Sequence, residues 1–193
     1  MDLEGQALVG AVSKTPDSQE VVVVDLKSPT RIRKRETPQL KRYIRAISIF
    51  PDVQAYVIAG LEGRVSVNHF IPDKQKDFVF KCHRKGASET EVYPIHALSV
   101  NSCHLGTFAT CGGDGTLSYW DRNSKTRLKN FLQGGLPVTA CAFNRTGRMM
   151  VYSTGYDWQR GLKAYNRDSM PTTLRIRGCP DSEIKPQSGG RGR

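Results

Sequence analysis

Three side chains of this 193-residue sequence could together carry out catalysis: a histidine, a hydroxyl and a carboxylate, from His83, Thr110 and Asp114. Such a trio can activate a nucleophile when the histidine takes the proton and the acid orients the histidine. The sequence contains no G-x-S-x-G nucleophile elbow, phosphate-binding glycine loop, paired carboxylates or metal-binding helix motif. We therefore predict that the protein is not an enzyme and uses no cofactor.

Cysteine and histidine side chains between residues 82 and 104 could instead build a zinc site. Their spacing matches no familiar zinc-ligand pattern, so no metal is predicted. The five cysteines of the chain are an odd number without a C-x-x-C pair, which argues against a disulfide framework and favours a reducing compartment. We interpret them as small buried apolar residues. The zinc candidates considered are Cys82, His83, His96, Cys103 and His104.

A basic segment follows the acidic N-terminus and contributes much of the net charge of +11. Between residues 27 and 45, eight lysines and arginines stand against one acid, Glu36. The cluster could contact phosphates or an acidic protein segment, or it could be a plain solvated loop. Aromatic residues do not alternate with the cations as they would in a base-stacking surface. The candidate phosphate or RNA contacts are Arg31, Arg33, Lys34, Arg35, Lys41 and Arg42.

Short β-branched or aromatic runs, separated by Gly, Asp, Asn and Pro, replace helical periodicity along the chain. Equivalent runs begin at Ile44, Ile95 and Val138, which are 51 and 43 residues apart. A period in the forties with three or four strands per unit is typical of a propeller blade. No apolar run approaches the ~18 residues needed to cross a bilayer. We therefore predict an all-β propeller without a membrane partner.

The middle unit resembles the WD-repeat family along Phe108-Ala-Thr-Cys-Gly-Gly-Asp-Gly-Thr-Leu-Ser-Tyr-Trp-Asp121. The resemblance implies a structural tetrad in which a histidine, a hydroxyl, a turn aspartate and a tryptophan are joined by hydrogen bonds. In such a tetrad each polar group hydrogen-bonds to another buried group, which favours a structural role over catalysis. The matching tetrad positions are His83, Thr110, Asp114 and Trp120.

The repeats predict an incomplete WD-repeat β-propeller, with about three and a half blades of a seven-bladed ring. Residues 1–43 are predicted to form a half blade without its first strands, and full blades to occupy about 44–80, 81–133 and 134–180. Residues 181–193 are predicted to form a flexible basic tail. Because an open ring leaves blade faces uncovered, we expect that this chain alone is poorly soluble or self-associates, or that it is a fragment of a longer protein.

Further segments resemble one subfamily of WD-repeat propellers, formed by the nuclear RNA-export propeller and its sister, the Bub-type checkpoint propeller. These segments are Leu61–Val67, Phe78–Arg84 and Glu91–His96. Ser153–Gly161, with its Tyr-Asp-Trp, resembles the export branch and departs from the checkpoint branch. The resemblance implies a non-enzymatic scaffold in nucleocytoplasmic mRNA export, located in the nucleus and at the nuclear pore, with shuttling to the cytoplasm.

Members of this subfamily bind short GLEBS motifs, so the resemblance implies a GLEBS-bearing nucleoporin as partner. Lys81 and Arg84 would pair with acidic or phosphorylated partner groups. Trp158 would anchor the partner, although an ordinary packed tryptophan is the alternative. Two other functions stay open, a spindle-checkpoint scaffold that binds checkpoint kinases at kinetochores and a direct RNA-binding protein. The sequence does not fix which nucleoporin is bound or the oligomeric state.

Overall fold

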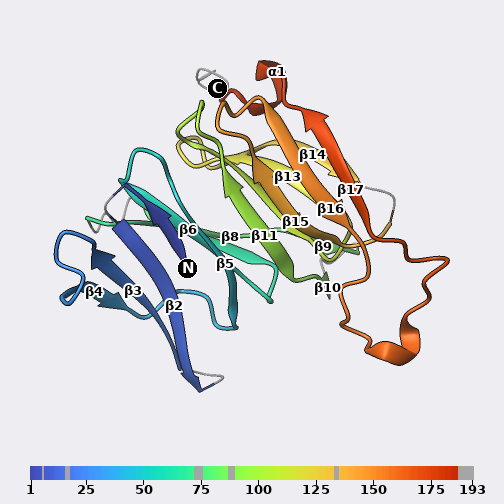
Figure 1. Cartoon of the computed structure of the whole chain (residues 1–193), viewed down its shortest axis with the longest axis horizontal. Helices are drawn as coiled ribbons and strands as arrows, with labels where there is room; N and C mark the ends of the chain where they lie inside the picture. The colour runs from blue at the N-terminus through green and yellow to red at the C-terminus, as the bar shows by residue number, and fades with distance from the viewer. Residues whose placement is uncertain (6, 16–17, 72–75, 87–89, 133–134, 187–193) are drawn as a thin grey trace.

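The structure is a computed structural model that describes residues 1–5, 7–15, 18–71, 76–86, 90–132 and 135–186. The strands of these residues form antiparallel sheets, and the four large sheets follow one another across the molecule in chain order (Figure 1). Within the described residues, no helix is long and apolar enough to cross a membrane.

Each of the four large sheets is a meander in which every strand pairs with the next strand along the chain. The first sheet contains β1 (Asp2–Glu4), β2 (Ala7–Thr15), β3 (Ser18–Asp25) and β4 (Ile32–Glu36). The second contains β5 (Ile44–Ile49), β6 (Ala55–Gly60), β7 (Arg64–His69) and β8 (Phe78–Lys81). The third contains β11 (Ile95–Val100), β12 (Thr107–Gly112), β13 (Thr116–Asp121) and β14 (Thr126–Leu132). The fourth contains β15 (Val138–Phe143), β16 (Met149–Thr154) and β17 (Thr173–Gly178).

Three smaller kinds of element complete the fold. A hairpin of β9 (Arg84–Lys85) and β10 (Glu91–Val92) lies between the second and third sheets in the chain. A short 3-10 helix, η1 (Leu162–Ala164), occurs in the segment between β16 and β17. The last element is a single helical turn, α1 (Asp181–Ile184).

The first sheet has four strands, so the prediction of a half blade without its first strands is wrong. Strand β1 pairs with β2 in antiparallel register, with Leu3 opposite Leu8. A carboxylate oxygen of Asp2 also accepts a hydrogen bond of 2.7 Å from the Ile49 backbone nitrogen. The strand was not recognised because three residues, two of them acidic, make no hydrophobic run.

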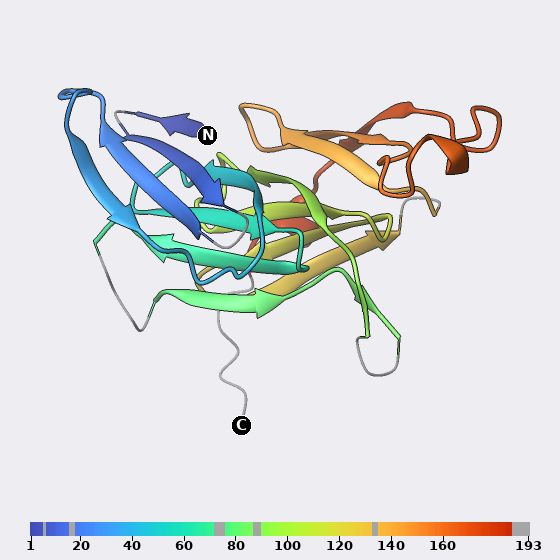
Figure 2. The ribbon, with the colours of Figure 1, turned by 90° about the horizontal axis from the view of Figure 1, so that it is seen from below.

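Neighbouring sheets pack face to face and bury three apolar clusters between them. Figure 2, turned by 90°, shows the first and fourth sheets at the two ends of the row. The arrangement is an open, partial propeller, which confirms the predicted all-β class. Fully buried members of the clusters are Val9, Val21 and Ile58 between the first two sheets, Phe50, Val57 and Phe108 between the second and third, and Leu117, Tyr119 and Met150 between the third and fourth.

The end of the described chain is docked, so the predicted flexible tail does not begin at residue 181. Ile184 of α1 is fully buried in the cluster between the third and fourth sheets. Its backbone carbonyl accepts a hydrogen bond of 2.7 Å from the Thr107 hydroxyl. The Arg177 guanidinium donates to both carboxylate oxygens of Glu183, at 2.9 and 2.7 Å. Residues 187–193 of the predicted tail lie outside the described residues.

Candidate partner-binding site

The four predicted tetrad residues meet in one hydrogen-bonded network, in which His83, just before β9, joins three residues of the third sheet and its turn. His83 Nδ1 lies 2.8 Å from Asp114 Oδ1, and His83 Nε2 lies 2.8 Å from Thr110 Oγ1. The indole nitrogen of Trp120 donates to the same Thr110 oxygen at 2.9 Å. A neutral His83 that donates from Nδ1 to Asp114 and accepts at Nε2 from the Thr110 hydroxyl satisfies both ring nitrogens.

The hydrogen bonds of this network, together with burial, shift the pKa values of the groups within and beside it. Burial raises the pKa of Asp114, but the interactions with His83 and the hydrogen bonds from Thr116 outweigh burial and lower it overall. Burial also raises the pKa of the neighbouring Cys82 thiol far above its usual range, so this thiol is a poor nucleophile. Within the described parts of the chain, no group of three or more His, Cys, Asp or Glu side chains is placed to hold a metal ion.

The tetrad also holds the hairpin of β9 and β10 against the third sheet. His83 adopts a φ of +51° just before β9, and its carbonyl accepts a hydrogen bond of 3.0 Å from the Tyr93 nitrogen. Two residues further, the Lys85 ammonium donates to the Asp114 carbonyl at 3.0 Å and lies 5.2 Å from the Tyr93 ring centroid. Lys85 is therefore held over the turn between β12 and β13.

A cleft of about 290 Å³ opens between this hairpin and the segment 155–172, which joins β16 to β17. The segment projects away from the sheets and carries η1 at its far end (Figure 1). Cations, aromatic rings and two acids therefore face the same space. The residues that line it include Lys85, Tyr93, Asp114, Tyr156, Asp157 and Arg160.

An aromatic trio, formed by Tyr156, Trp158 and Tyr165, lies in this segment. The ring centroids are 5.2 Å apart for Tyr156 and Trp158, 5.0 Å for Trp158 and Tyr165, and 5.6 Å for Tyr156 and Tyr165. Trp158 is nevertheless 55% exposed, and its φ of +64° lies in the left-handed region that non-glycine residues rarely adopt. Backbone strain of this kind concentrates at binding sites. The trio is a packed aromatic surface with one wide, exposed member.

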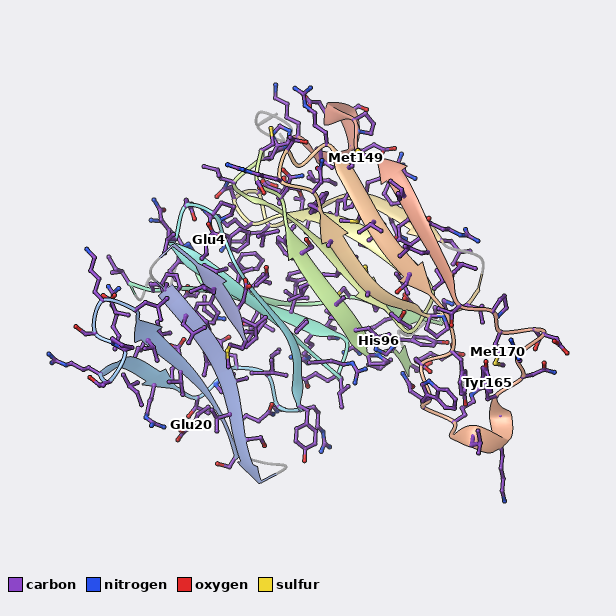
Figure 3. All side chains as sticks on the ribbon, in the orientation of Figure 1. Glu4, Glu20, His96, Met149, Tyr165 and Met170 are labelled. Atoms are coloured by element: carbon purple, nitrogen blue, oxygen red, sulfur yellow. The ribbon has the colours of Figure 1, made fainter. Side chains whose placement is uncertain are left out.

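A buried histidine anchors the segment to the third sheet. His96, on β11, places Nε2 3.1 Å from Asp157 Oδ2, which also accepts a hydrogen bond of 2.7 Å from the Gln159 amide. Figure 3 shows His96 at the end of the molecule where Tyr165 and Met170 also lie. Burial lowers the pKa of His96, and the interaction with Asp157 offsets this only in part.

The three predicted partner contacts occupy different environments. Trp158 is exposed and stacks on Tyr156, which lines the cleft. Arg84 is half-buried, and its guanidinium donates to the Glu62 carbonyl at 2.9 Å, so its first interaction is with the backbone of the second sheet. Lys81 is exposed at the end of β8. The cleft itself is lined by Lys85 and not by Lys81 or Arg84.

The predicted basic set lies in the first sheet and in the chain that follows it, whereas the cleft lies at the third and fourth sheets. Arg35 pairs with Glu20 at 3.0 Å, and Lys34 pairs with Glu36 at 2.5 Å. The structure therefore does not bring this set to the cleft. The remaining members are exposed, and they are Arg31, Arg33, Lys41 and Arg42.

Several cleft residues were not singled out in the sequence, although two signals pointed towards them. Tyr156 lies in the Tyr-Asp-Trp stretch, and Lys85 directly follows the Phe78–Arg84 segment. Tyr93 and Arg160 lie in the segments Glu91–His96 and Ser153–Gly161, but nothing in either segment marked them as site residues, since only the packing of the third and fourth sheets brings them to one cleft.

No protein-family model matches the chain, but curated proteins do. The chain is 38% identical over 167 residues to a protein of Danio rerio named mRNA export factor, an alignment that covers 81% of this chain and 45% of that protein. It is 35% identical over 178 residues to Protein RAE1 of Arabidopsis thaliana, with 91% and 50% covered. It is 32% identical over 191 residues to WD40 repeat protein poxJ of Penicillium oxalicum, with 97% and 54% covered. The chain thus spans about half the length of the curated relatives it matches.

Proposed function

This chain is a homologue of WD-repeat proteins named mRNA export factors, and we propose that it acts as a non-enzymatic scaffold in nucleocytoplasmic mRNA export. In finer terms, it holds a GLEBS-bearing nucleoporin segment and works at the nuclear pore. Its surface then serves to capture a polypeptide and to keep that polypeptide near RNA cargo.

The observation that carries partner binding is the cleft beside the aromatic trio. Trp, Tyr and Arg are the side chains most enriched at the energetic centres of protein interfaces. The exposed Trp158 ring offers apolar contact area beside Tyr156, which lines the cleft together with two cations, Lys85 and Arg160, that suit acidic groups on a partner. Lys85 is already positioned by the Asp114 carbonyl, so little side-chain entropy is lost when it binds.

Titration of a fluorescent synthetic GLEBS segment with the purified chain tests this assignment. Trp158→Ala should weaken binding by about tenfold or more, because a buried interface tryptophan typically contributes more than about 1.4 kcal/mol. The matched control is Leu162→Ala, which removes a similarly exposed apolar side chain from η1 of the same segment. Unchanged affinity of a folded Trp158→Ala variant would remove the cleft from the binding site.

The same assay can compare Lys85 with Lys81, a predicted partner contact at the end of β8. Lys85→Glu should weaken binding more than Lys81→Glu, because Lys85 lines the cleft and Lys81 does not. The opposite order would move the partner onto the β8 end of the second sheet. Preferential capture of checkpoint-kinase motifs over the nucleoporin segment would favour the checkpoint function instead.

Direct RNA contact through the first sheet is a second candidate, favoured by the exposed Arg31, Arg33 and Arg42. Phosphate contacts release counterions, so RNA affinity should fall steeply as salt rises. An Arg33→Gln, Arg42→Gln variant should bind more weakly and with a shallower salt dependence. A flat salt response of the unmodified chain would refute direct RNA binding.

A further inference from the structure

A second cavity opens where the first and second sheets meet, and residues of both sheets line it. Its volume is about 410 Å³. The lining combines apolar side chains with two exposed cations, and none of the described residues that line the cavity is acidic. We call this cavity the seam pocket, and the residues that line it include Arg33, Val53, Gln54, Phe70, Ile71 and Lys76.

The seam pocket and the cleft lie at opposite ends of the strands. The cleft lies at the turn before β13, which contains Asp114. Arg122 follows the other end of β13 and pairs with Asp52, in the turn between β5 and β6, with Nη1 3.1 Å from Oδ1. Val53 of the same turn lines the seam pocket. Because β13 has six residues and so spans about 20 Å, the two cavities are separate surfaces.

The second sheet presents Val53 to the pocket in a backbone conformation that a β-branched residue rarely adopts. Its φ is +51°, in the left-handed region. The turn is fixed by two backbone hydrogen bonds, from the Val53 nitrogen to the Phe50 carbonyl at 2.8 Å and from the Phe70 nitrogen to the Gln54 carbonyl at 3.0 Å. Strain of this kind persists where the surroundings enforce it, and it concentrates at binding sites. Val53 is thus held in place while 37% exposed.

A histidine and an aspartate fix the segment that joins β7 to β8. Asp77 Oδ1 accepts a hydrogen bond from the His69 backbone nitrogen and lies 2.8 Å from both that nitrogen and the ring Nδ1. This contact brings the two ends of the segment together, and Ile71 and Lys76 from the two ends both line the pocket. Ile71 is 78% exposed there. Asp77 is already paired within the chain, so the carboxylate near the pocket does not cancel its positive lining.

We propose that the seam pocket is a second polypeptide-binding site, which takes an acidic segment and inserts one of its apolar side chains beside Val53, Phe70 and Ile71. The positive lining is complementary in charge to such a segment, since Arg33 and Lys76 can pair with its carboxylates. The site is independent of the cleft, so the scaffold can hold two segments at once.

The shape of the lining favours a peptide side chain over a nucleic-acid base. Phe70 is the one Phe, Tyr or Trp among the described residues that line the pocket, and it packs against Tyr56 with ring centroids 5.5 Å apart. Bases bind single-stranded sites by stacking on aromatic faces. The aliphatic Val53 and Ile71 instead gain from contact with an apolar side chain that removes both from water.

Fluorescence anisotropy with synthetic heptapeptides tests the site. One probe carries three acidic residues on each side of a central leucine, and a matched probe carries serine at the centre. The leucine probe should bind at least about tenfold more tightly, because the pocket removes the leucine side chain from water. Equal affinities would mean that the net charge of +11 alone attracts the peptide, and would overturn the proposal.

Variants place the leucine probe at the pocket. Arg33→Glu should weaken its binding by at least about tenfold. The control Arg42→Glu makes the same charge change at an exposed site before β5, a whole strand away from Val53, and should alter affinity by about twofold or less. Val53→Gly removes apolar lining and relieves the strain, so it should weaken binding while the unfolding midpoint stays unchanged or rises. Unchanged affinity in both Arg33→Glu and Val53→Gly would overturn the site.

A competition separates the seam pocket from the cleft. A saturating unlabelled GLEBS segment should leave the affinity for the leucine probe unchanged, and so should Trp158→Ala. Displacement of the probe by that segment, or loss of probe binding in Trp158→Ala, would place both peptides at the cleft and overturn the second site. Binding of the probe by a chain that does not bind the GLEBS segment would refute the proposed function and leave the seam pocket standing.

Discussion

Thr110 is the residue on which the buried tetrad depends, because its hydroxyl oxygen contacts both the His83 ring and the Trp120 indole. Valine has nearly the same shape but cannot donate or accept a hydrogen bond. Thr110→Val should therefore leave two buried polar groups unpaired and lower the free energy of unfolding by about 2–4 kcal/mol. Urea unfolding measures this loss. Thr126→Val, at an exposed site of the same sheet, should stay within about 0.5 kcal/mol of the unmodified chain.

His96 makes stability depend on pH near neutrality. Burial holds its pKa in the folded chain below the ordinary value of 6.5, so the unfolded chain binds a proton that the folded chain does not. The stabilisation is complete above pH ~6.5 and is lost as pH falls below that value. The free energy of unfolding should therefore drop as pH falls below about 6.5, and less so in His96→Gln. His104→Gln serves as the control, and identical pH profiles for His96→Gln and the unmodified chain would contradict the assignment.

At the level of elements, Asn101 joins the turn after β11 to the turn between β15 and β16. Its side-chain oxygen accepts hydrogen bonds from the Cys103 and His104 nitrogens, at 2.8 and 2.9 Å. Its amide donates to the Gly147 carbonyl at 2.8 Å, and the residue is fully buried. One side chain thus fixes two turns that belong to different sheets.

Removal of this connection should destabilise the third and fourth sheets together. Asn101→Ala leaves three backbone groups without their partner and should cost about 3 kcal/mol in urea unfolding. The exposed Asn123, in the turn after β13, supplies the control, and Asn123→Ala should have little effect. A loss below about 1 kcal/mol in Asn101→Ala would mean that water replaces the side chain at both turns.

Some elements are easier to predict from the sequence than others. The difference depends on how far apart in the sequence the residues that form each element lie. Much of the third sheet follows from one contiguous stretch, Phe108–Asp121, because strands, turn and three of the four tetrad residues lie within 14 positions. His83 joins them from 27 positions before Thr110. Strand β1 exists because it pairs with β2, and a three-residue strand leaves no periodicity to detect. Local patterns thus predict local structure.

The candidate site is less predictable because it joins distant segments. The contact between His96 and Asp157 spans 61 positions, and Lys85 meets Tyr156 across the cleft only because the third and fourth sheets stack. The environment of Arg84 was equally hard to predict. Its guanidinium donates to the Glu62 carbonyl within the chain, and its contact with a partner stays a prediction.

Across the described residues as a whole, the second and third sheets are each covered by a neighbour on both sides, whereas the first and fourth are covered on one side only. In a stack held by nearest-neighbour contacts, opening starts at the ends and moves inward. Backbone amide protons of β6, β7, β12 and β13 should then be the last to exchange with solvent deuterium, and those of β4 and β17 among the first. Deuterium uptake along the chain would thus report the order in which the sheets separate from their neighbours.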